Sequence, residues 1–284
     1  MTIAGLLRPD VHLKIPVDPE TRDHLAARFG GIASEAGKVI ISYYSPDMNV
    51  TRKGDGSPVT EADTAAELLI RDKLDKLLPG IPIVAEESFS AEACNSAPEL
   101  FVLVDPLDGT REFIDRNGEF TVNIALIEHG RPIAGAVYAP ALNRMYVGGA
   151  RAFRAEVAPG DPMPPLDRME QLNTQSYPQS GLRAVASRSH LDPQTEALLS
   201  RLPVASRTLS GSSLKFCVMA QGDADVYPRF APTMEWDTAA GHAVLAAAGG
   251  CVVGSDGSPL RYCKTAAGFR NDSFVAWGRT PITP

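Results

Sequence analysis

Apolar residues recur at helical spacing in the first part of the chain, and shorter apolar runs follow them. Over residues 25–40 an apolar side chain returns every three or four positions, which predicts a long amphipathic helix after Pro19. A second apolar stripe over residues 66–77 predicts a helix that begins near Thr60 and ends at a Pro-Gly pair. Short β-rich runs then predict strands at residues 83–85, 101–104, 122–127 and 133–138, the last two joined in a hairpin at His129-Gly130.

A change of composition divides the chain into two parts. Residues 155–180 are rich in Pro, Gly, Ser and Gln without periodicity, so we expect a boundary or a surface excursion there. Beyond them, strands and helices alternate as in an α/β arrangement. We predict strands at 183–186 and 225–227, and helices after Asp192-Pro193, at 212–220 and at 237–248. The expected organisation is an N-terminal α+β half, residues 1–155, and a C-terminal α/β half, residues 156–284.

Charge and composition narrow the functional classes. The chain of 284 residues has a net charge of −7, which argues against a surface that binds nucleic acid. No window approaches the ~20 apolar residues of a membrane span, and the N-terminus has no apolar stretch of signal-peptide length. The four cysteines have neither the spacing of a zinc site nor the density of a disulfide scaffold. We therefore expect a cytoplasmic protein with no stable membrane insertion.

The most informative segment is an apolar strand that runs directly into Asp105-Pro-Leu-Asp108-Gly-Thr110. Such a strand delivers its carboxylates to a sheet edge, where the pair and the carbonyl of Leu107 suit Mg²⁺, a cation that prefers oxygen ligands. Gly109 permits close approach of the backbone, and the amides at Gly109 and Thr110 are candidates for binding a phosphate oxygen. The alternative is a strand-to-turn junction in which the two aspartates only cap the next turn.

Further acids also lie at element ends. Glu86-Glu87 ends a predicted strand, Asp63 lies in a predicted first helical turn, and Asp237 opens a helix of small residues. Each has a structural alternative: a solvated loop for Glu86-Glu87, a capping box with Thr60 for Asp63, and an N-cap for Asp237. Capping does not explain why so many acids stand at element ends beside a Gly-Thr turn suited to phosphate.

Four separated motifs resemble the inositol monophosphatase superfamily, in that family's order. They are Lys53-Gly-Asp55-Gly-Ser57-Pro-Val-Thr60-Glu-Ala-Asp63, Ala85-Glu86-Glu87-Ser88, Asp105-Pro-Leu-Asp108-Gly-Thr110-Arg-Glu-Phe113 and Glu235-Trp-Asp237-Thr-Ala-Ala-Gly241. The stretches 186–190, 211–217 and 224–230 are most similar to the 3'(2'),5'-bisphosphate nucleotidase branch. The resemblance implies a layered α-β-α-β-α sandwich of the inositol monophosphatase and fructose-1,6-bisphosphatase type, with metal ligands in the first half and substrate specificity in the second.

The resemblance also implies a role for individual residues. It makes the metal ligands Glu86, Asp105, the carbonyl of Leu107, Asp108 and Asp237, with Asp63 near a more weakly held ion. Asp55 and Thr110 would orient and deprotonate the attacking water. The implied substrate contacts are Gly109, Thr110, Ser187, His190, Ser212, Lys215 and Arg229. On the bare sequence His190 is equally well explained as a solvated strand-end residue, and Lys215 as an ordinary helix-surface lysine.

The implied activity is removal of the 3'-phosphate of 3'-phosphoadenosine 5'-phosphate, and of 3'-phosphoadenosine 5'-phosphosulfate, with two or three Mg²⁺ ions. Divalent ions suit this chemistry because they offset the charge of the phosphate dianion and lower the pKa of a bound water. The resemblance further suggests inhibition by lithium and a role in sulfur metabolism. The alternatives are an inositol monophosphatase or fructose-1,6-bisphosphatase activity on the same metal site, and a non-catalytic module that binds divalent cations.

Overall fold

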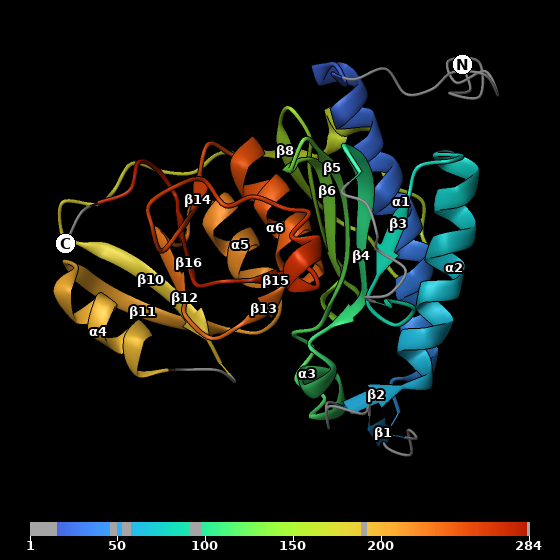
Figure 1. The fold of residues 1–284 in the computed structure, drawn as a ribbon, viewed down its shortest axis with the longest axis horizontal. Helices are drawn as coiled ribbons and strands as arrows, with labels where there is room; N and C mark the ends of the chain where they lie inside the picture. The colour runs from blue at the N-terminus through green and yellow to red at the C-terminus, as the bar shows by residue number, and fades with distance from the viewer. Residues whose placement is uncertain (1–15, 46–49, 53–57, 91–97, 189–191, 283–284) are drawn as a thin grey trace.

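The helices and strands are stacked in five layers. A computed structural model describes residues 16–45, 50–52, 58–90, 98–188 and 192–282. Helices alternate with sheets in the order helix, sheet, helix, sheet, helix (Figure 1), which confirms the layered sandwich implied by the resemblance. The helices are α1 (Pro19–Tyr43), α2 (Glu61–Leu77), α3 (Thr110–Ile114), α4 (Pro193–Arg201), α5 (Leu214–Ala220) and α6 (Trp236–Ala247).

The first sheet has seven strands in the order β3-β4-β5-β6-β7-β8-β9. These are β3 (Ile83–Ala85), β4 (Leu100–Asp108), β5 (Thr121–Glu128), β6 (Arg131–Ala139), β7 (Arg144–Gly148), β8 (Ala152–Glu156) and β9 (Glu170–Leu172). Only the β3–β4 pair is parallel. The predicted β5–β6 hairpin is confirmed, and His129 and Gly130 both have positive φ (48° and 70°), as a tight two-residue turn requires.

Helices α1 and α2 cover one face of this sheet, and their apolar stripes form one core cluster with it. α1 begins as predicted, with Pro19 in its first turn and the side chain of Asp18 accepting from the amide of Thr21. Gly37 lets α1 approach β6 closely, because a Cβ there would lie 2.4 Å from the ring of Tyr138. The packing of α1 against the sheet therefore depends on the missing side chain at Gly37 as well as on the apolar stripe of the helix.

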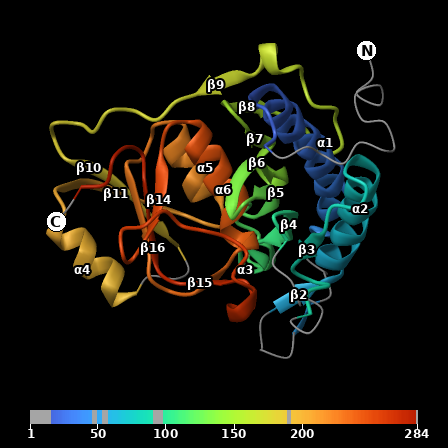
Figure 2. The same cartoon turned by 45° about the horizontal axis from the view of Figure 1, so that its top comes forward.

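The second sheet has five strands in the order β11-β10-β12-β16-β14. They are β10 (Leu182–Ser187), β11 (Val204–Ser210), β12 (Val226–Arg229), β14 (Cys251–Gly254) and β16 (Phe274–Trp277). Helices α5 and α6 fill the layer between the sheets, and α4 packs on the outer face of the second sheet (Figures 1 and 2). Two small pairs, β1 (Val50–Arg52) with β2 (Pro58–Thr60) and β13 (Thr233–Met234) with β15 (Arg270–Asn271), complete the described strands.

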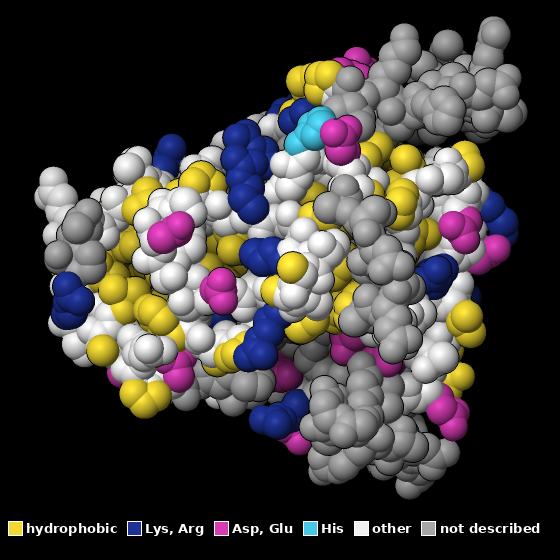
Figure 3. Space-filling view, in the orientation of Figure 1, with side chains coloured by type: hydrophobic (Ala, Val, Ile, Leu, Met, Phe, Trp, Pro, Cys, Tyr) yellow, Lys and Arg dark blue, Asp and Glu magenta, His cyan; other side chains and the backbone are white. Residues whose placement is uncertain are grey.

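The predicted excursion at 155–180 lies along α1 before the chain enters the second sheet. The amide of Gly160 donates to the carbonyl of Ser34 at 3.0 Å, and β9 extends the first sheet. The sequence did not predict strands β1, β2, β7, β8, β9, β11, β13, β14, β15 and β16. On the face shown in Figure 3, several Lys and Arg side chains lie one below another near the middle of the view. None of the helices in the described ranges is long and apolar enough to cross a membrane.

Candidate active site

Strand pairing brings Glu86 and Asp105 to the same edge of the first sheet. β3 and β4 run parallel, with Ala85 opposite Val104, so Glu86, which follows β3, comes level with Asp105, which lies within β4. The amide of Glu86 donates to the carbonyl of Val104 at 3.2 Å, which continues the pairing to the acid itself. The two motifs are separated in sequence, and their meeting follows from the register of this one parallel pair.

The first turn of α6 adds Asp237 from the other half of the chain. One carboxylate oxygen from each of Glu86, Asp105 and Asp237 lies within 4.8 Å of the other two. Asp237 Oδ2 accepts from the amide of Met234 at 2.8 Å, and its carbonyl accepts from the Ser213 hydroxyl at 2.6 Å. Asp237 lies inside the helix, so the N-cap interpretation is wrong: Glu235 is the residue that precedes α6.

This acidic cluster, Glu86, Asp105 and Asp237, brings like charges together around a buried Asp105, with Glu86 and Asp237 half-buried. Burial raises the pKa of Asp105 well above its usual range, and the negative charges of Glu86, Asp108, Asp237 and Asp63 raise it further. Burial and neighbouring carboxylates raise the pKa of Asp237 in the same way. A divalent cation offsets such repulsion, and carboxylate oxygens are the ligands that Mg²⁺ prefers. The donor set therefore fits a hard divalent cation.

A bulge in β4 aims the next acid, Asp108, toward the second half of the molecule. Pairing with β5 shifts register between Asp105 and Asp108, so one additional residue is accommodated on β4. Asp108 Oδ2 accepts from the Asn123 amide at 3.3 Å, and Asn123 also donates to Ser213 Oγ at 3.0 Å. Burial raises the pKa of Asp108, whereas the positive charge of Lys215 lowers it. Asp108 thus lies between the acidic cluster and a cation of the second half.

Asp63 has both the capping role and a place at the site. Its Oδ2 accepts from the amide and the hydroxyl of Thr60, at 2.8 and 2.6 Å, so the predicted capping box is confirmed. Its Oδ1 accepts from the Thr110 hydroxyl at 3.3 Å, and the same hydroxyl lies 3.4 Å from the carbonyl of Leu107. Asp55, the expected partner of Thr110, lies outside the described residues.

Gly109 occupies a position that a side chain would strain. Its φ of 91° is left-handed, and a Cβ there would lie 3.2 Å from Glu112 Oε2 and 3.3 Å from the Cβ of Ser212. Its carbonyl accepts from the amide of Phe113 at 2.9 Å, which closes the single turn of α3. The glycine therefore lets the loop around Ser212, from the second half, approach the end of β4.

Lys215 is a buried cation on the opposite side of the site. It is 5% exposed, its ammonium donates to the carbonyl of Ser212, and it lies 5.3 Å from the centre of the Tyr227 ring. Burial lowers the pKa of Lys215 to about 8, against the opposing effect of Asp108. Ser212 itself has a φ of 42°, and its buried hydroxyl has no hydrogen-bond partner among the described residues. The burial of Lys215 contradicts the alternative of an ordinary helix-surface lysine.

The other described residues of the predicted substrate site lie at the ends of strands of the second sheet. Arg229 ends β12, is 9% exposed, and donates through Nε to the carbonyl of Ala231 at 3.1 Å. Its positive charge lowers the pKa of Lys215, so the two cations act on the same region. Ser187 is buried at the end of β10. His190 lies outside the described residues.

The sequence analysis did not identify Glu119, which links the loops of the two halves. Its carboxylate accepts from Arg188 Nε and Nη2, at 3.0 and 2.9 Å, and from the amide of Gly211 at 2.7 Å. Arg188 stood inside the segment 186–190 that carried the resemblance, whereas no local pattern marks Glu119. This ion pair depends on contacts between distant segments, which sequence spacing does not reveal.

The chain belongs to the inositol monophosphatase family, whose model matches residues 22–275. It is 45% identical over 252 residues to "3'(2'),5'-bisphosphate nucleotidase CysQ" of Escherichia coli strain K12, covering 86% of this chain and 95% of that protein. The protein of the same name from Haemophilus influenzae is 32% identical over 246 residues, covering 84% of this chain and 88% of that protein. The crystal structure of CysQ from Bacteroides thetaiotaomicron has a TM-score of 0.79 at 38% identity, covering 91% of this chain and 98% of that one.

Proposed function

We propose that the protein is a Mg²⁺-dependent 3'(2'),5'-bisphosphate nucleotidase that hydrolyses the 3'-phosphate of 3'-phosphoadenosine 5'-phosphate and of 3'-phosphoadenosine 5'-phosphosulfate. The observation that carries the proposal is the acidic cluster facing a buried Lys215 across Asp108. The sequence identity of this chain to the two nucleotidases named above, over most of both chains, supports this choice of substrate. An activity on these substrates would belong to sulfur metabolism, and the sparse cysteines suit the cytoplasm.

The residues that would hold the metal are the acidic cluster together with Asp108, the carbonyl of Leu107 and, for a weaker ion, Asp63. When bound, two or three Mg²⁺ ions neutralise the phosphate charge and lower the pKa of water. The acidic cluster is supported from β3, β4 and α6, so three separate elements hold it in place. Lithium should inhibit by competing at one metal position.

Thr110 orients the attacking water together with Asp55. Asp63 accepts from the Thr110 hydroxyl at 3.3 Å, so the hydroxyl oxygen keeps its lone pairs available for a water proton. The role of the base that takes the water proton is assigned to Asp55 by the resemblance of its motif. The chemistry requires no covalent enzyme intermediate, since a positioned water is the nucleophile.

Lys215 and Arg229 select substrates that carry a second phosphate. A cation of low exposure is worth more to a phosphate than a surface cation, because water competes less for it. Lys215 is 5% exposed, and Arg229 presents a guanidinium capable of bidentate contacts. Ser187, Ser212 and His190 complete this side, with His190 near the nucleobase, and Gly109 and Thr110 contact the phosphate that is removed.

The test is inorganic phosphate release from 3'-phosphoadenosine 5'-phosphate, inositol 1-phosphate and fructose 1,6-bisphosphate in parallel, with Mg²⁺ and with chelator. We expect the nucleotide to have the highest kcat/KM and the chelator to abolish activity. Preference for the inositol or sugar phosphate would contradict the substrate assignment alone. Absence of turnover on all three, with divalent cations still bound, would favour a cation-binding module.

A further inference from the structure

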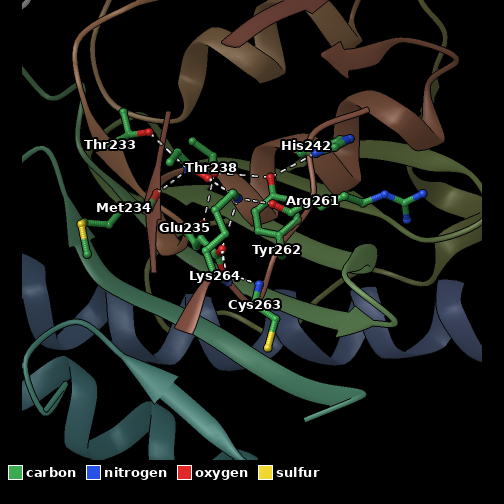
Figure 4. A network of polar contacts seen from close by, with 10 residues as sticks. Thr233, Met234, Glu235, Thr238, His242, Arg261, Tyr262, Cys263 and Lys264 are labelled. Atoms are coloured by element: carbon green, nitrogen blue, oxygen red, sulfur yellow. Dashed lines mark hydrogen bonds and ion pairs between the residues drawn. The ribbon is translucent and has the colours of Figure 1, made fainter. Parts of the chain in front are cut away.

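A buried ionic network lies directly before the helix that presents Asp237. The side chain of Glu235 is fully buried and accepts from the amides of Cys263 and Lys264, at 2.7 and 2.9 Å, and from the Lys264 ammonium at 3.3 Å (Figure 4). The Lys264 ammonium also donates to the carbonyl of Arg261 and to Asn271 Oδ1. A buried carboxylate of this kind is stable only while its partners stay in place.

Asn271 connects this network to the acidic cluster. Its amide donates to the carbonyl of Met234 at 3.0 Å and to the Thr238 hydroxyl at 3.0 Å. The amide of Met234 in turn donates to Asp237 Oδ2 at 2.8 Å. Met234 is thus held through its carbonyl by Asn271, and through its amide it holds the carboxylate of Asp237.

We propose that Glu235, Lys264 and Asn271 are positioning residues that hold the Asp237 carboxylate in its metal-binding place through Met234. The need for such support is physical: Asp237 faces the negative charges of Asp108 and Glu86, which favour a rotamer that turns away from them. A preorganised ligand binds a cation more tightly, because no reorganisation accompanies binding. This inference rests on the proposed function, since it requires a divalent cation at the acidic cluster.

The same network also fastens residues 261–269 to α6, which is a purely structural role. Cys263 and Phe269 both have positive φ (77° and 60°), a conformation that costs free energy in residues with side chains. The amide of Cys263 donates to Glu235, and the carbonyl of Phe269 accepts from the amide of Glu235 at 2.8 Å. A decisive test must therefore separate support of Met234 from support of this loop.

Tyr262 offers a matched control within the network. Its buried hydroxyl donates to the Thr238 hydroxyl at 3.3 Å and lies 3.0 Å from His242 Nδ1. Tyr262→Phe removes a contact to the same Thr238 that Asn271 contacts, but leaves the link to Met234 intact. Asn271→Leu, of similar volume, removes both.

The experiment is calorimetric titration of the metal-free proteins with Mg²⁺ and with Mn²⁺. We expect Asn271→Leu to raise the Kd for the cation about 10-fold, within the range of about 10–100-fold usual for residues that orient metal ligands. Tyr262→Phe should lower Tm and leave the Kd within about 2-fold of wild type. An Asn271→Leu protein with wild-type Kd, or an equal loss in both variants, would overturn the inference. Wild-type protein that binds neither cation would overturn the proposed function and the inference together.

Enzyme kinetics provide a second readout. In Asn271→Leu the Mg²⁺ concentration for half-maximal activity should rise about 10-fold, while KM for the phosphorylated substrate at saturating Mg²⁺ stays unchanged. If Asn271→Leu does not fold, Glu235→Gln serves the same purpose, because it keeps the size of the side chain and replaces one acceptor with a donor. A rise in substrate KM without a rise in the Mg²⁺ requirement, in either variant, would contradict a positioning role.

Discussion

The two sides of the site are constructed differently. On the acidic side, Glu86 directly follows β3 and Asp105 lies within β4 at the end of its pairing with β3, so the backbone register places them. On the basic side, Lys215 comes from α5 and Arg229 from the end of β12, and both donate to backbone carbonyls of their own loops. The acidic side repels itself in the absence of a cation, whereas the basic side is partly satisfied by the protein.

This difference predicts different consequences of mutation. A carboxylate at a strand end cannot be replaced by a neighbour, because its position follows from the sheet, and the chemistry depends on its charge. The buried cations already have carbonyl partners, and the role proposed for them is to select the substrate. Changes on the acidic side should therefore affect turnover, and changes on the basic side should affect discrimination between substrates.

The largest effect is expected for Asp105→Asn. Loss of this carboxylate should lower kcat at least about 1,000-fold, because several kcal/mol of transition-state charge stabilisation depend on the cation that Asp105 is proposed to hold. The metal-free protein should become more stable at pH 7, since burial and like charges raise the pKa of Asp105 in the folded state and so penalise its ionised form. Phosphate release and thermal unfolding in chelator measure the two effects.

The pH dependence of that stability gain has a definite sign. A carboxyl whose pKa is raised in the folded state contributes stability below its unfolded pKa, and this contribution is lost as the pH rises through the folded pKa. The Tm difference between Asp105→Asn and wild type should accordingly shrink as the pH falls toward about 4, the unfolded pKa of Asp. A variant with wild-type kcat, or one destabilised at pH 7 in chelator, would contradict this account of the acidic side.

Lys215→Met should change specificity more than turnover. On the proposed contact between Lys215 and the second phosphate, its loss should raise KM for 3'-phosphoadenosine 5'-phosphate by about 10–100-fold, equivalent to about 1.5–3 kcal/mol for a charged hydrogen bond. Inositol 1-phosphate, which lacks a second phosphate, should be affected much less. The control is Lys73→Met on α2, which removes a lysine paired with Glu35 far from the site. Equal losses on both substrates would show that Lys215 supports the fold or the metal rather than the second phosphate.

The sequence predicted the acidic side better than the basic side for a physical reason. Strand ends and helix starts are local features, so the patterns around Glu86, Asp105 and Asp63 identified both the elements and the acids. The hairpin of β5 and β6 was predicted for the same reason, from its alternating pattern and its turn residues.

The sequence predictions failed where contacts between distant segments determine whether a strand forms or where a side chain points. β11 is a largely exposed edge strand whose polar residues gave no strand pattern, and β14 and β16 are short runs of four residues each. The helical pattern alone allowed Asp237 to be an N-cap, whereas its carboxylate accepts from the amide of Met234 and lies near those of Glu86 and Asp105, as the resemblance implied. Such orientations depend on how the two halves pack, which periodicity along one segment does not encode.

Glu119→Gln tests the connection between the two sides. The substitution weakens the bidentate ion pair with Arg188 and the bond to the amide of Gly211, and so loosens the loop that carries Ser212. We expect KM for the nucleotide to rise about 10-fold, the equivalent of about 1.4 kcal/mol, with the Mg²⁺ requirement unchanged. Glu170→Gln is the matched control, because it breaks an exposed Arg154 ion pair on β8 and β9. An unchanged KM in Glu119→Gln would show that this ion pair has no effect on substrate binding.

The smallest effect on catalysis is expected from Asp23→Ala, although it lies in the same half as the acidic cluster. The buried carboxylate of Asp23 accepts from the amides of Ala150 and Arg151, at 2.8 and 2.9 Å, and pairs with the Arg151 guanidinium. Its loss leaves two amides without their acceptor and should lower the free energy of unfolding by about 2 kcal/mol. Urea unfolding measures this loss, while kcat and KM of the folded fraction should remain those of wild type. A change in either constant would mean that the packing of α1 against the first sheet affects the positions of Glu86 and Asp105. The acidic side would then depend on contacts between distant segments, as the basic side does.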